Sequence, residues 1–189
     1  MGFGGAGGSP RTVSQPGAPV VALQYSPDSL RLAFVREGAL GQRELWVVRT
    51  DGSESDGTLV TRGNLALTSG AYSPDGSRVA VVNRTIGHSG HLQILPVAGA
   101  GMEAAGDAAE AAWHPSGGYL VVTAPDRDGR LQLWAVEARA PYRRKALSQF
   151  DAGLQPTCRI SPDGSQALAL LEEPTGTTVV FVRLTPPGF

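Results

Sequence analysis

The chain has 189 residues, and its 16 lysines and arginines against 17 aspartates and glutamates leave a formal net charge of -1. A charge this close to zero argues against a protein that binds nucleic acid through electrostatics, because such proteins carry a strongly basic face. The 25 glycines and 14 prolines predict many turns, and the single cysteine excludes an intrachain disulfide and a cysteine-rich zinc site.

The domain organisation predicted is simple. We expect a flexible glycine-rich tail over residues 1–10, one β-rich domain over residues 11–185 and a short tail over residues 186–189. No apolar run reaches the length of about 18 residues that a membrane-spanning helix needs, and residues 1–10 lack the basic and apolar regions of a signal peptide. These features predict a cytoplasmic protein or one peripheral to a membrane complex, and a periplasmic one if a signal was removed.

A four-residue turn motif recurs along the chain. The sequence Ser-Pro-Asp-Ser, or a close variant of it, begins at Ser26, Ser73, His114 and Ser161, at spacings of 47, 41 and 47 residues. A polar first residue, a proline at the second position and, in three of the four copies, a glycine at the fourth are typical of a type I turn. Four equivalent hairpins are therefore predicted.

Apolar segments repeat together with these turns. Strands are predicted before the turns at residues 20–25, 67–72, 108–113 and 155–160, and after them at residues 30–35, 79–82, 120–123 and 167–171. A third strand begins nineteen residues after the first turn residue, without a gap in any unit, at Leu45, Leu92, Leu133 and Val180. The residue before each turn is large and suited to packing between sheets: Tyr25, Tyr72, Trp113 and Ile160.

An outer strand completes each predicted unit. It is expected at residues 58–62 and 145–149, whereas residues 96–106 are so rich in glycine and alanine that an irregular edge is expected there. Units of 40 to 50 residues with four short strands describe the blade of a β-propeller. The predicted fold class is therefore all-β and β-propeller-like, with four blades of about four antiparallel strands each.

The repeated segments also resemble a known family. The units YSPDSLRLAFV, YSPDGSRVAVV, WHPSGGYLVVT and ISPDGSQALALL, each followed by its third strand, resemble WD40-like PD40 repeats, the blades of TolB-type propellers. The resemblance covers residues 12–184 and implies the fold, but it carries almost no functional information. Such blades resemble those of binding proteins, lipoproteins and the gating propellers of serine peptidases. The family usually has six or more blades, whereas four are present here.

Two arrangements of four blades remain open, a small closed ring and an open arc. Residues 11–15 precede the first turn by the same interval at which residues 58–62 precede the second, so Thr12-Val13-Ser14 is a candidate outer strand that would complete the last blade. We favour the open arc, in which a partner covers the terminal blade faces, because an apolar sheet face needs a second layer.

No convergent set of catalytic, cofactor-binding or metal-ligating residues is predicted, and neither a cofactor nor a metal is expected. His88 and His91 are interpreted as loop histidines, Asp126-Arg127-Asp128-Gly129 as a polar hairpin turn that lacks the ligand series of a calcium loop, and Cys158 as a buried thiol. The basic cluster Arg143-Arg144-Lys145 is interpreted as protection of an edge strand, with contact to an acidic protein surface or to anionic headgroups as the alternative.

The predicted function is that of a non-enzymatic protein-interaction module, an extrinsic scaffold or accessory subunit that docks on and stabilises a larger complex. Its partners would be other protein subunits, with peripheral membrane association only through a partner. Loops at one end of the blades and the two tails should carry the contacts. The residues expected in those contacts are Phe3, Arg36, Arg43, His88, His91, Asp126, Arg127, Asp128, Arg143, Arg144 and Phe189.

Two other classes of function were weighed. The first is a ligand-binding or gating propeller domain that serves an enzyme such as a peptidase. The second is a stand-alone hydrolase or lyase, which would need His88, His91, His114 and the acidic loop residues to converge on one site.

Overall fold

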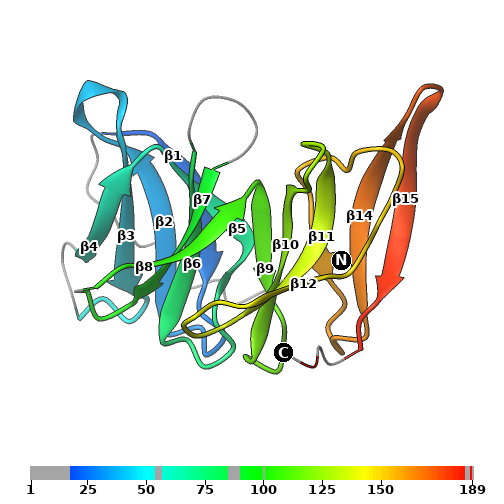
Figure 1. Ribbon diagram of the computed structural model, residues 1–189. Helices are drawn as coiled ribbons and strands as arrows, with labels where there is room; N and C mark the ends of the chain where they lie inside the picture. The colour runs from blue at the N-terminus through cyan, green and yellow to red at the C-terminus, as the bar shows by residue number, and fades with distance from the viewer. Residues whose placement is uncertain (1–17, 54–56, 85–89, 100, 186–187, 189) are drawn as a thin grey trace, which may run out of the picture.

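The computed structural model describes residues 18–53, 57–84, 90–99, 101–185 and 188, which form four consecutive β-sheet blades (Figure 1). Blade 1 contains β1 (Val20–Tyr25), β2 (Arg31–Glu37), β3 (Arg43–Arg49) and β4 (Thr58–Gly63), with a short 3-10 turn η1 (Ala39–Gly41) after β2. Blade 2 contains β5 (Leu65–Tyr72), β6 (Arg78–Arg84), β7 (Gly90–Pro96) and β8 (Glu103–Ala108). Blade 3 contains β9 (Glu110–Trp113), β10 (Tyr119–Pro125), β11 (Leu131–Glu137) and β12 (Arg144–Ala146). Blade 4 contains β13 (Arg159–Ile160), β14 (Gln166–Glu173) and β15 (Gly176–Arg183).

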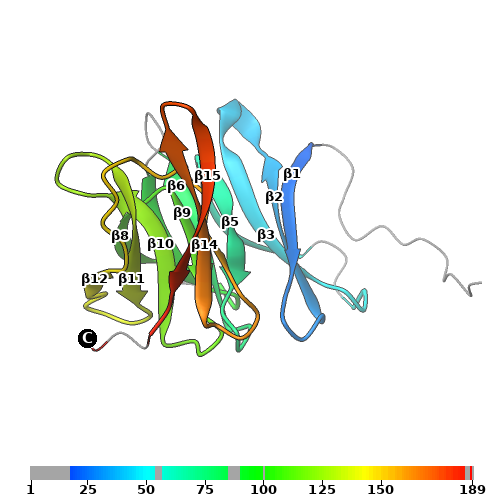
Figure 2. The same cartoon turned by 90° about the vertical axis from the view of Figure 1, so that its right-hand side faces the viewer.

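The blades form an open arc. Strands within a blade are antiparallel and follow chain order, and one parallel bridge between Gly70 and Ala112 joins the innermost strands of blades 2 and 3. Blade 1 lies at one end of the arc and blade 4 at the other, which Figure 2 views from the side of blade 4. The predicted all-β, propeller-like class is confirmed, and its open form is the one present. The predicted strand at residues 12–14 lies outside the described residues.

The four turns share one set of hydrogen bonds. In each, the backbone N–H of the fourth residue donates to the carbonyl of the first, as from Gly76 to Ser73 at 2.8 Å and from Ser29 to Ser26 at 2.9 Å. The Ser73 hydroxyl accepts the N–H of Arg78 and donates to the carboxylate of Asp75. The strands on the two sides of every turn pair in the same register, so that in blades 2 to 4 the residue before the turn faces the preceding blade.

The hydrophobic core consists mainly of layers between blades. One cluster of buried side chains lies between blades 1 and 2, a second between blades 2 and 3, and a third between blades 3 and 4. Tyr72 and Trp113, each directly before a turn, pack in the first and second of these clusters. The Trp113 indole N–H also donates to the carbonyl of Ala71 at 3.0 Å, which ties blade 3 to blade 2.

Three details of the predicted strands were wrong. Residues 103–108 form a regular strand, β8, instead of an irregular edge, because Gly106 takes a φ of +86° that lets the strand follow β7 around a bulge. The third outer strand is shorter than expected, since β12 ends at Ala146. The strand before the fourth turn is reduced to β13, with an isolated bridge between Leu154 and Leu171 ahead of it.

The gapless register is also wrong in blade 4. In blades 1 to 3 the residue seven positions after the first turn residue pairs with the residue twenty-one positions after it, as Val121 pairs with Ala135 in blade 3. In blade 4 the corresponding Leu168 pairs with Phe181, which is one residue earlier, because the hairpin between β14 and β15 is one residue shorter. A shift by one residue moves every side chain of a strand to the opposite face. Phe181 consequently points away from blade 3, and Val180 and Val182 point towards it.

Ser29 is the only one of the four fourth-position turn residues that is not glycine, and its φ of +61° lies in the left-handed region. We predict that Ser29→Gly raises the free energy of unfolding by roughly 0.5–1 kcal/mol, because it removes the steric cost of a Cβ in that region. Gly76→Ser, at the equivalent position with a φ of +68° and only an ordinary contact of the added Cβ with Pro27 at 3.8 Å, should lower it by a similar amount. Urea unfolding of both variants checks the pair, and equal signs would contradict it.

The turn aspartates make the stability depend on acid. The Ser73 hydroxyl, followed by the N–H and hydroxyl of Ser77, lowers the pKa of Asp75 from its ordinary value to about 2. This carboxylate therefore stabilises the fold above pH 4 or so, and its contribution is lost as the pH falls towards about 2. Asp75→Asn should lower the Tm by a few degrees at pH 7, and the difference from the wild type should vanish near pH 2. Asp151→Asn, at an exposed side chain with no hydrogen bond among the described residues, is the matched control. A difference in Tm that stays constant with pH would show that the charge is not responsible.

Candidate interaction surfaces

The outer face of blade 1 exposes apolar side chains. Leu23 and Tyr25 on β1 are 61% and 60% exposed, whereas the turn-equivalent residues Tyr72 and Trp113 are 5% and 6% exposed. Behind them Leu32, Phe34 and Val48 form a separate buried cluster, against which Trp46 packs. The exposed part of this face is therefore confined to the side of β1, at the end of the arc.

The outer face of blade 4 is apolar as well. Val179 and Phe181 on β15 are 52% and 67% exposed, and they pair across the hairpin with the half-buried Leu170 and Leu168. In blades 1 to 3 the third strand pairs with a fourth, but β15 has no such neighbour among the described strands. Blade 4 therefore exposes both an apolar row and the backbone edge of a strand.

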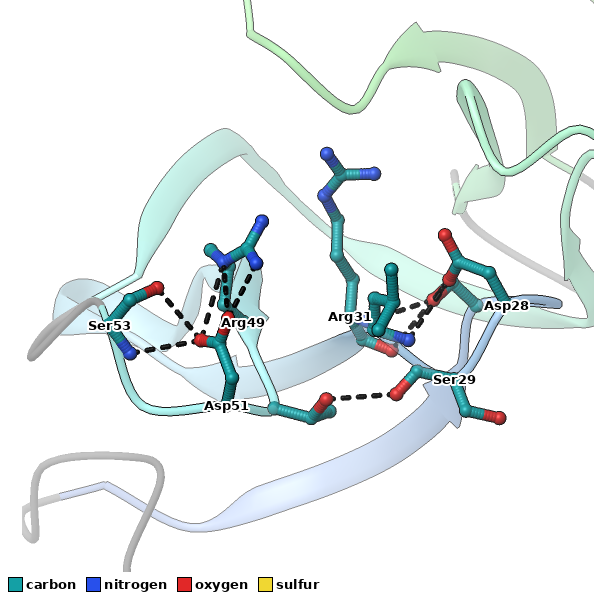
Figure 3. Close-up of polar contacts among 9 residues, drawn as sticks. Asp28, Ser29, Arg31, Arg49, Asp51 and Ser53 are labelled. Carbon is teal, nitrogen blue, oxygen red and sulfur yellow. Dashed lines mark hydrogen bonds and ion pairs between the residues drawn. The ribbon is translucent and has the colours of Figure 1, made fainter.

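A depression of about 510 Å³ lies between blades 1 and 2 at the turn end. Arg31, Arg49 and Thr58 line it from blade 1, and Asp75 and Ser77 line it from blade 2. Figure 3 shows the Arg31 side chain extending between the Arg49–Asp51 pair and the turn that holds Asp28. Hydrogen bonds from Arg49 and then from Ser53 hold the pKa of Asp51 below its usual range. The lining thus combines one accessible guanidinium with the carboxylate of Asp75, a mixed charge suited to a small polar group.

Arg31 and Arg78 occupy equivalent positions in blades 1 and 2, yet they behave differently. The Arg78 guanidinium lies 4.7 Å from the centre of the Trp113 ring and donates to the carbonyl of Ala138 at 2.5 Å, so it clamps blade 2 to blade 3. The Arg31 guanidinium makes no hydrogen bond or ion pair within the described part of the chain. It is therefore available to a molecule from outside.

The two arginines expected at the first loop have partners within the chain. Arg36 donates to Glu44 at 3.0 Å and lies over the Trp46 ring, while Arg43 donates to the carbonyl of Leu65 in blade 2 at 3.0 Å. Hydrogen bonds from Trp46, and then from Arg36 and Arg62, lower the pKa of Glu44 despite its burial. Above this network the loop tip Leu40 is fully exposed at a φ of +59°. The arginines hold the loop, and Leu40 is the side chain that it presents.

Other expected contact residues are spread over several elements. His91 pairs with Asp107 of β8 at 2.9 Å. Asp126 accepts the N–H groups of Asp128 and Arg130, as a polar hairpin turn requires, while Arg127 and Asp128 are exposed. His91 and His114 lie at opposite ends of their blades, since His91 is the second residue of β7 and His114 lies in the turn after β9. The structure therefore does not bring these two histidines together.

The basic cluster has partners of its own. Arg143 donates to the buried carboxylate of Glu137 at 2.9 Å, and this bond is the main reason that the pKa of Glu137 is lowered. Arg144 donates to the carbonyls of Ala105 and Asp107 at 2.8 and 2.7 Å, and its burial lowers its own pKa. The space for the Arg144 guanidinium depends on Gly106, where an added Cβ would lie 2.8 Å from it. Arg143 therefore makes its bond within blade 3, and Arg144 connects blade 3 to β8 of blade 2.

Phe3, His88 and Phe189 lie outside the described residues. Cys158 is buried as predicted, and burial raises the pKa of its thiol to about 12. Within the described ranges, no three histidine, cysteine or acidic side chains are placed to hold a metal ion. In the same part of the chain, no helix combines the length and apolar character needed to span a bilayer.

Comparison with known proteins identifies the fold. No protein-family model matches the sequence, and no curated protein matches it. A protein described as TolB from Agrobacterium tumefaciens superposes with a TM-score of 0.69 at 15% identity, over 86% of this chain and 60% of that one. TolB from Acinetobacter baumannii gives 0.66 at 18% identity, over 91% of this chain and 45% of that one. A puromycin-hydrolysing peptidase from Mycobacterium tuberculosis gives 0.63 at 16% identity, over 92% and 32%.

These structures define the class of the protein as a β-propeller module, present here as an arc. Its fold is TolB-like. The chain spans 60% or less of the length of each of these structures, and at such low identity the likeness shows the fold alone.

Sequence reasoning missed Leu23, Tyr25, Val179 and Phe181 as exposed residues. The repeat itself contained a signal for Tyr25, since it is the first of four equivalent large residues and no preceding blade covers it among the described residues. No such signal existed for Phe181, because its orientation depends on the shortened hairpin.

The contrast between the two equivalent arginines can be tested by stability measurements. Arg78→Ala should lower the free energy of unfolding by about 2 kcal/mol, because it removes both the contact with Trp113 and the hydrogen bond to Ala138. Arg31→Ala should change it by less than about 0.5 kcal/mol, because the half-buried Arg31 side chain makes no hydrogen bond or ion pair within the described residues. Urea denaturation gives both values, and a larger loss for Arg31→Ala than for Arg78→Ala would contradict the assignment.

Proposed function

We propose that the protein is a non-enzymatic protein–protein interaction module, which serves as a scaffold or accessory subunit of a larger assembly. The observation that carries this proposal is the exposed pair Leu23 and Tyr25 on the terminal blade. In blades 2 and 3 the residue before the turn is covered by the preceding blade, and in blade 1 no preceding blade is described. A partner that covers this face would take the place of that blade.

The chemistry of the face supports a protein partner. Tyrosine is enriched among the residues that dominate binding energy, since it combines a large apolar ring with a hydroxyl that can donate a hydrogen bond. Exposed apolar residues grouped at one place on a folded surface are typical of a binding site. The overall charge of -1 gives no support to a nucleic-acid partner.

The finer features of the proposal follow from the repeat and the loops. We assign the blades to the WD40-like PD40 type, and we place secondary contacts at the loop that carries Leu40 and at the hairpin of residues 126–129. Membrane association, where it occurs, would pass through the partner. The alternative of a propeller that gates an enzyme is supported only by the likeness to peptidase structures. The identity of the bound partner distinguishes the scaffold function from the gating function.

Substitution at the terminal face provides the test. The purified chain, immobilised and exposed to extract of its native cell, should retain a partner in a constant ratio, and Leu23→Asp with Tyr25→Asp should reduce that retention at least tenfold. Charged groups at the centre of an apolar contact cost several kcal/mol when they are buried without a partner. Quantitative mass spectrometry of the retained proteins is the measurement.

Leu40→Asp is the matched control, because Leu40 is also an exposed apolar residue but lies on a loop. Because the contacts of this loop are secondary, this variant should reduce retention by no more than about twofold. Loss of the partner with Leu40→Asp and not with the double variant would move the docking site to the loops and overturn the proposal for the terminal face. The unfolding curves of all variants should match that of the wild type, since the three side chains are exposed.

A further inference from the structure

The strand β15 differs from the outer strands of the other three blades. Each outer strand carries charged side chains: Arg62 on β4, Glu103 and Asp107 on β8, and Arg144 and Lys145 on β12. Charges of this kind keep exposed sheet edges from pairing with other chains. From Gly176 to Val182 β15 has neither a charge nor a proline, although it is the last strand of its sheet. Its composition is therefore that of a strand with neighbours on both sides.

We infer that β15 is a self-association site, at which two copies of this chain pair antiparallel through their β15 edges and join their three-stranded blades into one six-stranded sheet. This inference goes beyond the proposed function and involves the opposite end of the arc from Leu23 and Tyr25. The dimer would leave both copies of the blade 1 face accessible.

The register of the pair follows from the sequence of β15. Residues that lie opposite each other in antiparallel strands share one face of the sheet. The two copies can therefore pair only in registers that keep Val179 and Phe181 of both copies on the same face of the joined sheet. One such register places Val180 opposite Val180 of the second copy. In this register Val179 of each copy lies opposite Phe181 of the other. Pairs of an aromatic with a β-branched residue are among the favourable cross-strand pairs.

Neighbouring strands extend this apolar centre. Phe181 pairs with Leu168 and Val179 pairs with Leu170 within each copy. Across the junction, the row Leu168, Phe181, Val179 of the second copy and Leu170 of the second copy would be continuous, and the two-fold axis repeats it. The exposed fractions of Val179 and Phe181 show how much apolar surface is available for this contact.

The charges at the ends of the strand are complementary in the same register. Arg183 of one copy would lie opposite Thr177 of the other, and Thr177 pairs with Glu172 on its other side. Arg183 and Glu172 of the second copy would then flank Thr177 on one face, about two strand spacings or ~10 Å apart between backbones, within reach of two long side chains. A shift of the register by two residues loses this arrangement. In one direction Phe181 of one copy lies opposite Thr177 of the other, and in the other direction Arg183 lies opposite Val179.

A second copy is favoured over other occupants because β15 is complementary to itself. An isologous contact needs the same patch on both partners. Here β15 provides the apolar pairs and Arg183, and the adjoining β14 of the same blade provides Glu172. An unrelated strand, or residues 12–14 of the same chain, could also pair with the edge, but the register described above needs only a second copy of β15 and its blade. Both are outcomes that the experiment separates.

Light scattering of the purified full chain provides the first measurement. The wild type should approach twice its chain mass of 19.6 kDa as its concentration rises to about 100 μM, and Val179→Asp with Phe181→Asp should return it to 19.6 kDa. Both side chains are exposed, so the double variant should keep the circular dichroism spectrum of the wild type. A wild type that remains at 19.6 kDa throughout, or a dimer that persists in the double variant, would overturn the inference.

Cross-linking tests the register. Val180→Cys should form an intermolecular disulfide under mild oxidation, because opposite residues of adjacent antiparallel strands have Cβ atoms about 5 Å apart. Thr178→Cys, on the same face two residues away, should cross-link at least tenfold more slowly, since it would face Val182 of the second copy. The native Cys158 is buried and remains in both variants. Equal cross-linking of both would refute this register. Because Leu23 and Tyr25 are unchanged in these variants, the result is independent of the docking test on blade 1.

Discussion

A β-sheet with two apolar faces needs a neighbour on each side, and this requirement governs the whole molecule. Three clusters of buried side chains separate the four blades, so each internal face is covered by the next blade along the chain. Burial of apolar surface is the largest favourable contribution to folding, which explains why the internal layers contain valine, leucine and alanine at less than one-tenth exposure. The apolar residues at the two ends are exposed because no further blade lies against them in the described part of the chain.

The turns make the four blades comparable residue by residue. Because Ser73 and its equivalents fix the pairing of the adjoining strands, the residue before the turn packs against the preceding blade in blades 2 to 4. Differences between equivalent residues then report on their surroundings. Tyr25 and Trp113 have the same place in the repeat, and only Trp113 is covered and clamped by an arginine. The exposure of Tyr25 thus results from its position in the arc, since an aromatic residue at this place is buried wherever a preceding blade is present.

The sequence was sufficient to predict features that depend on neighbouring residues. It was insufficient to predict features that depend on residues far along the chain. Turn chemistry and alternation are local, so β1 was predicted at its observed bounds, as were the class of fold and the burial of Cys158. The strand β8 was missed because its glycine and alanine give little local preference, while bonds from Arg144, far along the chain, hold its carbonyls. The face of Phe181 was missed because one residue of hairpin length decides it. At the candidate surfaces, the exposure of an apolar side chain depends on whether another blade lies against its own. The alternation of apolar and polar residues within one blade does not contain that information.

The two ends of the arc differ in what they require of a partner. Blade 1 offers side chains, and an apolar surface of matching shape from any fold can cover Leu23 and Tyr25. Blade 4 offers a row of side chains beside an unpaired backbone edge, and only another strand satisfies the N–H and C=O groups of such an edge. The edge therefore restricts its partner by backbone geometry before any side chain is considered. A molecule with one end of each kind can hold a strand at blade 4 while blade 1 selects a different surface, which is the property that a scaffold subunit needs.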